Sequence, residues 1–210
     1  MIMKILVFAL WLLTLAGTSM TRAAETASAD TLVWCGLDYS KVKLIGTLDF
    51  QQPEQIFPGM LNAWNGLFMK EMLPELEKMA KSVRSDIAAV QPGNDKATGS
   101  QIERKDGTSD EMVKPSHITE AEIADIVKSY KMENQSGLGL VFIMDRLVKA
   151  QQVGCMYVVF FDVSTRKVIS SERVVGKAGG IGFRNFWFSP VKTTVKQLPK
   201  MYKQATTPKK

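Results

Sequence analysis

The stretch GLVFIMDRLVKAQQVGCMYVVFFDVSTRKVISSERVV, residues 139–175, decides the fold of this chain. It contains three runs that are rich in Val, Ile, Leu and Phe, at residues 139–149, 153–163 and 167–175. The polar links between the runs are short enough for hairpins, so the pattern predicts a three-strand meander. Nearly every residue from Met156 to Phe161 is apolar, which is typical of a strand that is covered on both faces.

Helix signals lie on both sides of these strands. Upstream, Thr119 and Glu122 have the spacing of a capping box, which predicts a helix that begins there. Residues 134–137, Asn-Gln-Ser-Gly, end it. Downstream, Ser189 followed by Pro190 predicts a second helix start, because Ser caps a helix and Pro suits its first turn.

The amino-terminal half adds strands and a helix. Residues 32–39 and 43–48 are rich in Val, Ile, Leu and aromatic residues and predict two strands. Apolar residues then recur at three- and four-residue steps over residues 61–83, which predicts an amphipathic helix that Pro74 kinks or divides. Residues 86–90 favour another short strand.

The order of these elements predicts one domain over residues 30–210. A chain of 210 residues with 45% hydrophobic and 23% charged residues has the composition of an ordinary globular domain. Residues 91–116 are polar and predict a mobile loop within it. We expect an α/β (α+β) sandwich: a single mixed β-sheet, with a carboxy-terminal three-strand meander and helices packed on it.

The first 29 residues have the pattern of a secretory signal peptide. Lys4 precedes an apolar run at residues 5–17, and Ala-Ser-Ala at residues 27–29 predicts cleavage before Asp30. The run is too short to cross a bilayer, which needs about 20 residues. Cys35 does not follow a small-residue box. We therefore expect an exported protein, periplasmic or secreted, without a lipid anchor or a transmembrane segment in the mature chain.

The two cysteines leave a disulfide and two buried thiols as alternatives. In an oxidising compartment Cys35 and Cys155 could pair, whereas free cysteines also pack well as small hydrophobic residues. One His and two Cys without a CxxC motif fall short of a zinc site, which needs about four ligands. We predict no metal and no cofactor.

No motif in the sequence indicates a particular reaction. His117 is the only histidine and stands beside Ser116, but no GxSxG segment presents a nucleophile. The glycines of residues 176–182 match neither common phosphate-binding pattern. Four carboxylates of interest are scattered along the chain: Asp38, Asp49, Asp145 and Asp162. We predict no catalytic residue, and the alternative is a hydrolase of envelope polymers that uses such carboxylates or Ser116 and His117.

Charge is distributed unevenly along the chain. Residues 30–172 carry an excess of acidic residues, whereas residues 173–210 hold nine Lys and Arg and no Asp or Glu. This asymmetry predicts an acidic partner for the carboxy-terminal end. Export argues against nucleic acid and leaves an anionic envelope component or an acidic protein. The residues that we expect to bind it, on and before the last helix, are Arg184, Lys192, Lys196 and Lys203.

The segment FFDVSTRKVISSERVVGKAGGIGFRNFWFSPVKTTVKQL, residues 160–198, resembles small secreted proteins of the Bacteroides group. Its strand, D-x-x-T-x-x-V turn, second strand, glycines and closing helix are also similar, more distantly, to the TolB amino-terminal domain. Curli-secretion and penicillin-binding-protein-activator lipoproteins share that layout. The resemblance implies a binding or scaffolding role in the cell envelope and no chemistry, so we predict a non-enzymatic envelope protein.

Overall fold

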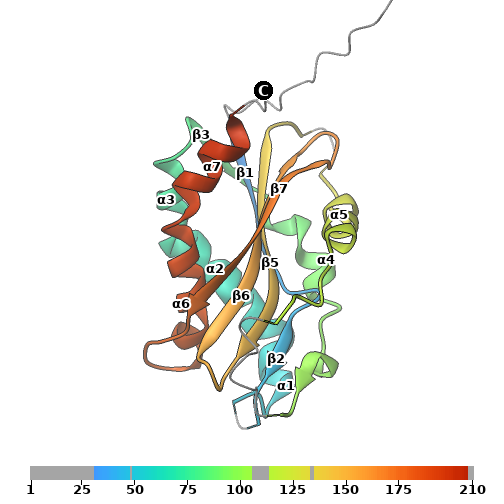
Figure 1. The fold of residues 1–210 in the computed structure, drawn as a ribbon, viewed down its shortest axis with the longest axis vertical. Coiled ribbons are helices and arrows are strands. Elements are labelled where there is room, and N and C mark those ends of the chain that lie inside the picture. Colours follow the sequence, from blue (N-terminus) through green and yellow to red (C-terminus); the bar gives the residue numbers. More distant parts are fainter. Residues whose placement is uncertain (1–30, 48, 106–113, 133–134, 208–210) are drawn as a thin grey trace, which may run out of the picture.

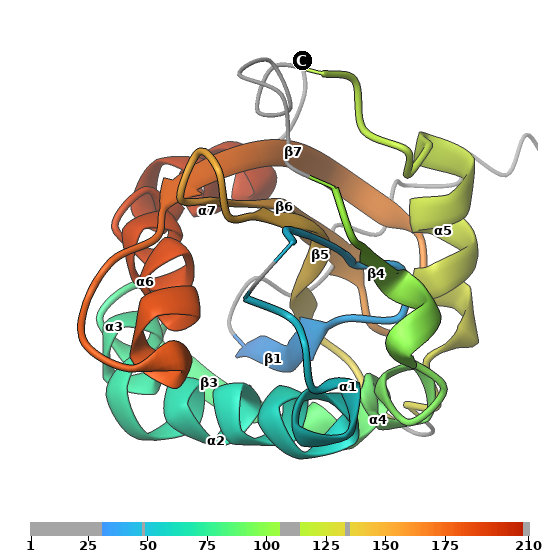
Figure 2. The same ribbon diagram turned by 90° about the horizontal axis from the view of Figure 1, so that it is seen from below.

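One curled sheet of seven strands forms around the long central strand β5 (Leu138–Val148) (Figures 1 and 2). The computed structural model describes residues 31–47, 49–105, 114–132 and 135–207. The other strands are β1 (Thr31–Asp38), β2 (Lys43–Ile45), β3 (Ser82–Ser85), β4 (Ile102–Glu103), β6 (Val153–Asp162) and β7 (Val168–Lys177). The α-helices are α1 (Pro53–Gln55), α2 (Leu61–Glu71), α3 (Leu73–Glu77), α4 (Gln91–Asn94), α5 (Glu120–Ser129), α6 (Phe183–Val195) and α7 (Leu198–Thr206).

The two edges of β5 are paired differently. Along one edge, β1 pairs in parallel with the first part of β5 and β2 with its last part, so β1 and β2 follow one another along the same neighbour. Along the other edge, β6 pairs antiparallel over the whole length of β5, and β7 pairs antiparallel with β6. Strands β3 and β4 add parallel to β1 and β2. The predicted α/β class is confirmed.

Helices cover both faces of the sheet. The side chains of β5 alternate: Leu140 and Phe142 belong to a large apolar cluster with residues of α2, α3, α6 and α7, whereas Val141 and Ile143 belong to a second cluster with α5. Figure 1 shows these two groups of helices on opposite sides of the strands. Because both faces are covered, β5 is buried at every position, as the mostly apolar pattern of its sequence indicates.

The helix predicted over residues 61–83 is divided in two, and its second part ends at Glu77, earlier than expected. Helix α2 ends at Glu71, and α3 begins at Leu73 with Pro74 in its first turn. Val83 lies in the edge strand β3, which is mostly exposed and therefore carries no clear apolar pattern. The strand predicted at residues 86–90 is wrong, since Ile87–Ala89 form a 3₁₀ turn after β3.

The segment predicted as a mobile loop contains short regular elements. Residues 91–103 form α4, a 3₁₀ turn at Gly99–Gln101 and the strand β4. The side chains of Thr98 and Gln101 form a capping box there. In so polar a segment this helix signal is hard to recognise from the sequence. Residues 106–113 lie outside the described residues.

The last helix begins earlier than predicted and continues in two parts. Helix α6 begins at Phe183, and Pro190 lies inside it rather than at its first turn. A helical Pro190 leaves the carbonyl of Phe186 without its usual N–H donor. The hydroxyl of Ser189 donates a hydrogen bond of 3.0 Å to that carbonyl and so offsets the loss. A break at residues 196–197 then separates α6 from α7, whose first turn contains Pro199.

The prediction of a signal peptide falls on residues 1–29, which lie outside the described residues. Within the described residues, no helix has the length and apolar character needed to cross a membrane.

Candidate functional site

Asp145 lies where the pairing of β5 is interrupted on both edges. On the β6 side, Met144 and Arg146 have partners but the register shifts between them, so Asp145 has no opposite residue. On the other side, β1 ends opposite Ile143 and β2 begins opposite Arg146. The turn at residues 39–42 therefore faces β5 at this point. A bulge of this kind redirects a side chain, and such bulges are common next to functional sites.

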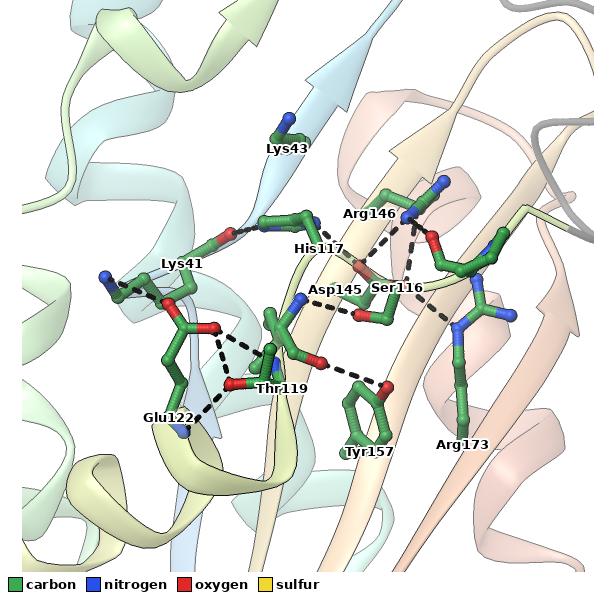
Figure 3. A network of polar contacts seen from close by, with 12 residues as sticks. Lys41, Lys43, Ser116, His117, Thr119, Glu122, Asp145, Arg146, Tyr157 and Arg173 are labelled. Carbon is green, nitrogen blue, oxygen red and sulfur yellow. Dashed lines mark hydrogen bonds and ion pairs between the residues drawn. The ribbon is translucent and has the colours of Figure 1, made fainter.

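The buried carboxylate of Asp145 is surrounded by three basic side chains (Figure 3). Its Oδ2 accepts a hydrogen bond from Nε of Arg173 at 2.9 Å and lies 3.3 Å from Nε of Arg146. Its Oδ1 lies 3.0 Å from Nδ1 of His117. Burial alone raises the pKa of Asp145, but His117 and the two guanidinium groups outweigh this and lower the pKa below its ordinary value. The carboxylate is held in its ionised form.

The imidazole of His117 connects β5 with the turn between β1 and β2. Its Nδ1 faces Asp145, and its Nε2 lies 2.8 Å from the backbone carbonyl oxygen of Lys41. In this geometry His117 lies between the turn and the strand and contacts both.

A cavity of about 240 Å³ lies beside His117. Its wall comes from three parts of the chain: Ser40, Lys41, Val42, Lys43, Ser100, Gln101, Glu103 and His117. The single carboxylate in this wall is Glu103, which forms ion pairs with Lys43 at 2.8 Å and Lys105 at 2.7 Å. Hydrogen bonds from Lys105 and Lys43 lower the pKa of Glu103 to about 2. The charged groups of the cavity thus already have partners within the chain.

The arrangement around His117 does not present a nucleophile among the described residues. A general base needs a ring nitrogen within reach of the group that it deprotonates, and Nε2 is bound to Lys41. The hydroxyl of Ser116 accepts a hydrogen bond from the amide of Ile118 at 2.9 Å, which is a local turn contact. Ser116 and His117 are adjacent in sequence but have separate structural roles.

The remaining carboxylates singled out from the sequence are dispersed. Asp38 is buried at the end of β1, where its oxygens accept hydrogen bonds from the hydroxyl of Tyr130 at 2.7 Å and the amide of Ser40 at 2.8 Å. Burial raises the pKa of Asp38, and these two hydrogen bonds only partly oppose the shift. Asp49 pairs with Lys149, and Asp162 accepts hydrogen bonds from Thr165 in the turn after β6, as its position in the sequence indicated.

Cys35 and Cys155 are both free and buried in this fold, which corresponds to the second of the two alternatives, two buried thiols. Cys35 lies in β1 and Cys155 in β6, and these strands pair with opposite edges of β5. The two strands are therefore about 10 Å apart across the sheet, and Cys35 lies near Leu140 of β5 whereas Cys155 lies opposite Arg146. A disulfide requires Cα atoms within about 7 Å. Burial raises the pKa of both thiols, which makes them unreactive.

The four predicted binding residues, Arg184, Lys192, Lys196 and Lys203, are spread along α6 and α7. Arg184 is exposed in the first turn of α6, while Lys196 is exposed at its end, about 18 Å away along the axis at 1.5 Å per residue. Between them, Lys192 forms an ion pair with Glu71 of α2 and lies over the ring of Phe188. Lys192 thus contributes to the contact between two helices.

Three lysines at the junction of α6 and α7 do share one side. Lys196 and Gln197, in the break between the two helices, both have φ and ψ angles in the right-handed helical region. Lys196, Lys200 and Lys203 follow at spacings of four and three residues, which places them on one face, and all three are exposed. We call this set the junction lysines. None of them forms an ion pair with any residue that the structure describes.

Sequence reasoning missed the centre at Asp145, which it treated as one of several scattered acids. The available signal was the Asp145-Arg146 pair inside an otherwise apolar strand, since adjacent charges in a buried strand need partners from elsewhere. Those partners, His117 and Arg173, are 28 residues away in either direction, and only the fold brings them together. No group of three or more His, Cys, Asp or Glu side chains among the described residues could hold a metal ion.

No protein-family model matches the chain, and no curated protein matches its sequence.

Proposed function

We propose that this protein is a non-enzymatic, exported envelope protein that binds an anionic partner through the junction lysines, Lys196, Lys200 and Lys203. In this proposal an α/β sandwich with a carboxy-terminal meander is the rigid support for the two helices. The observation that carries the proposal is that these three exposed lysines have no ion-pair partner in the described part of the chain.

The contrast with Lys192 supports an external partner. Where a carboxylate is within reach, as Glu71 is for Lys192, the chain forms the pair. Around the junction lysines no acid is present in the sequence from residue 173 onward. Like charges spaced by three or four residues destabilise a helix by a few tenths of a kcal/mol per pair. The chain retains this repulsion, which an anionic partner would remove.

The chemistry of lysine indicates the kind of partner. An ammonium group is a compact, hydrated charge on a flexible stem, so it recognises an array of negative charges rather than one shaped group. Such a surface fits anionic lipid headgroups, acidic glycans or an acidic protein. Binding through exposed charges weakens as salt rises, because screening at physiological ionic strength acts over about 8 Å.

The hydrolase alternative has one observation in its favour, the contact between His117 and the buried Asp145. A base oriented by a carboxylate is part of many hydrolytic sites. Against it, Nε2 of His117 is bound to a backbone carbonyl, and the cavity beside it has one carboxylate, whose pKa is lowered rather than raised. We therefore favour binding over catalysis.

The test of the proposal is the triple variant Lys196→Gln, Lys200→Gln, Lys203→Gln. Its matched control is Lys70→Gln, Lys96→Gln, Lys167→Gln, which removes the same charge from exposed lysines on other elements. Sedimentation with isolated envelope membranes is measured at low and high salt. Each lysine near an anionic surface contributes about 1 kcal/mol, so the triple variant should bind on the order of 100-fold more weakly than the control. Equal binding of the two variants would refute the proposal.

A further inference from the structure

The loop between β7 and α6 exposes a large apolar side chain. Ile181 is 93% exposed, and the other large hydrophobic residue that is exposed among those described, Ile87, reaches only 37%. In Figures 1 and 2 the loop projects from the outline of the molecule where β7 leads into α6. An apolar side chain in such a position loses contact with water only if something outside the chain covers it.

The exposure of Ile181 is built into the loop. Gly180 and Gly182, on either side, have φ angles of +107° and +81°, which side chains other than glycine rarely adopt. Hydrogen bonds hold the loop: the amide of Gly179 donates to the carbonyl of Phe186 at 3.2 Å, and Asn185 donates to the carbonyl of Ile181 at 3.3 Å. The loop is therefore a defined projection with an apolar tip.

Cations flank this tip in the sequence and acids do not. Lys177 precedes it and Arg184 follows it, and both are exposed without an ion-pair partner in the described residues. No Asp or Glu occurs in the sequence from residue 173 to residue 207. An apolar tip between unpaired cations is the arrangement that interfacial membrane contacts use.

We infer that the loop at residues 178–182 contacts an anionic lipid bilayer, with Ile181 inserted at the headgroup boundary and Lys177 and Arg184 on the headgroups. A convex tip with one apolar side chain needs no complementary pocket, and a fluid lipid interface provides none. One isoleucine and two cations give weak, reversible contact, since even a myristoyl chain, which buries more apolar surface, binds a membrane only marginally. The inference stands apart from the proposed role of the junction lysines, which lie at the other end of α6.

A local fluorescent probe tests it in the full chain. Ile181→Cys is labelled with an environment-sensitive dye. The two native cysteines are both buried, and wild-type protein treated with the same dye gives the background signal. The matched control is Ile87→Cys, at the other exposed isoleucine. With vesicles of phosphatidylcholine containing about one third phosphatidylglycerol, we expect a blue shift at position 181 and none at 87. With phosphatidylcholine alone the shift should be much smaller.

Substitutions then separate the apolar and the charged contribution. Ile181→Ser should weaken vesicle binding about tenfold or more, and Ile181→Leu should preserve it, because the effect follows apolar area. In the labelled protein, Lys177→Gln with Arg184→Gln should reduce both the affinity and its salt dependence. No blue shift at position 181 on anionic vesicles, or an equal shift on neutral vesicles, would overturn the inference.

Discussion

The charged groups around Asp145 and the junction lysines differ in whether their charges are paired within the chain. In the first region Arg146, Arg173 and His117 all converge on one buried carboxylate. In the second, three lysines point to solvent without a partner in the described chain. Buried charges must be paired because their desolvation is costly, whereas exposed charges remain hydrated at little cost. The difference teaches that the first region serves the fold, and that the second is free to serve an external contact.

The largest expected effect comes from removing the acid at the centre of the buried group. Asp145→Asn leaves two guanidinium groups near a buried site without their counter-charge, so it should lower the free energy of unfolding by about 3–5 kcal/mol. Urea denaturation followed by circular dichroism measures this. Asp125→Asn, on the exposed face of α5, is the matched control and should change stability by less than about 0.5 kcal/mol. A loss of below about 1 kcal/mol at position 145 would show that this centre does not stabilise the fold.

A smaller, pH-dependent effect is expected at the second buried acid, Asp38. Its pKa is raised in the folded state by burial, so the folded state binds a proton more tightly than the unfolded one. The stability that this provides is present below the unfolded pKa of about 4 and is lost as pH rises through the folded pKa. Asp38→Asn cannot ionise, and its amide can accept from the Ser40 amide and donate to Tyr130.

The stability of Asp38→Asn relative to wild type should therefore increase as pH rises above about 4. Denaturation at a series of pH values tests this. The direction in which stability changes with pH distinguishes the effect of Asp38 from that of Asp145. The pKa of Asp145 is lowered, so its contribution is present above about pH 4 and is lost on acidification. A constant difference between Asp38→Asn and wild type from pH 4 to pH 8 would contradict the raised pKa.

Sequence patterns were reliable where one segment determines its own structure. The capping box of Thr119 and Glu122 defines the start of α5, and the apolar run of residues 156–161 is buried in β6 as expected. The start of α6 was misjudged because Ser189 and Pro190 look like a cap, while the aromatic residues before them already form the helix. Local signals compete with packing, and packing prevailed there.

The charged centre could not be predicted for a different reason. Its members come from β5, β7 and the segment before α5, and nothing in the sequence of one segment specifies the others. The separation of Cys35 and Cys155 is of the same kind, since it depends on which edge of β5 each strand occupies. The absence of acids after residue 173 was visible in the sequence, but the pairing of Lys192 with Glu71 was not.

The smallest expected effect is on the stability of variants at α6 and α7. Lys196→Gln, Lys200→Gln and Lys203→Gln together should leave the free energy of unfolding unchanged or raise it by a few tenths of a kcal/mol, because they relieve repulsion and break no pair. Lys192→Gln is the comparison within the same helices. It loses an ion pair with Glu71 at a partly exposed site and should cost about 0.2–1 kcal/mol. Thermal unfolding of both variants at low salt measures the difference. If the triple variant were the less stable of the two, the junction lysines would be holding the fold together, and their availability to an external anion would have to be abandoned.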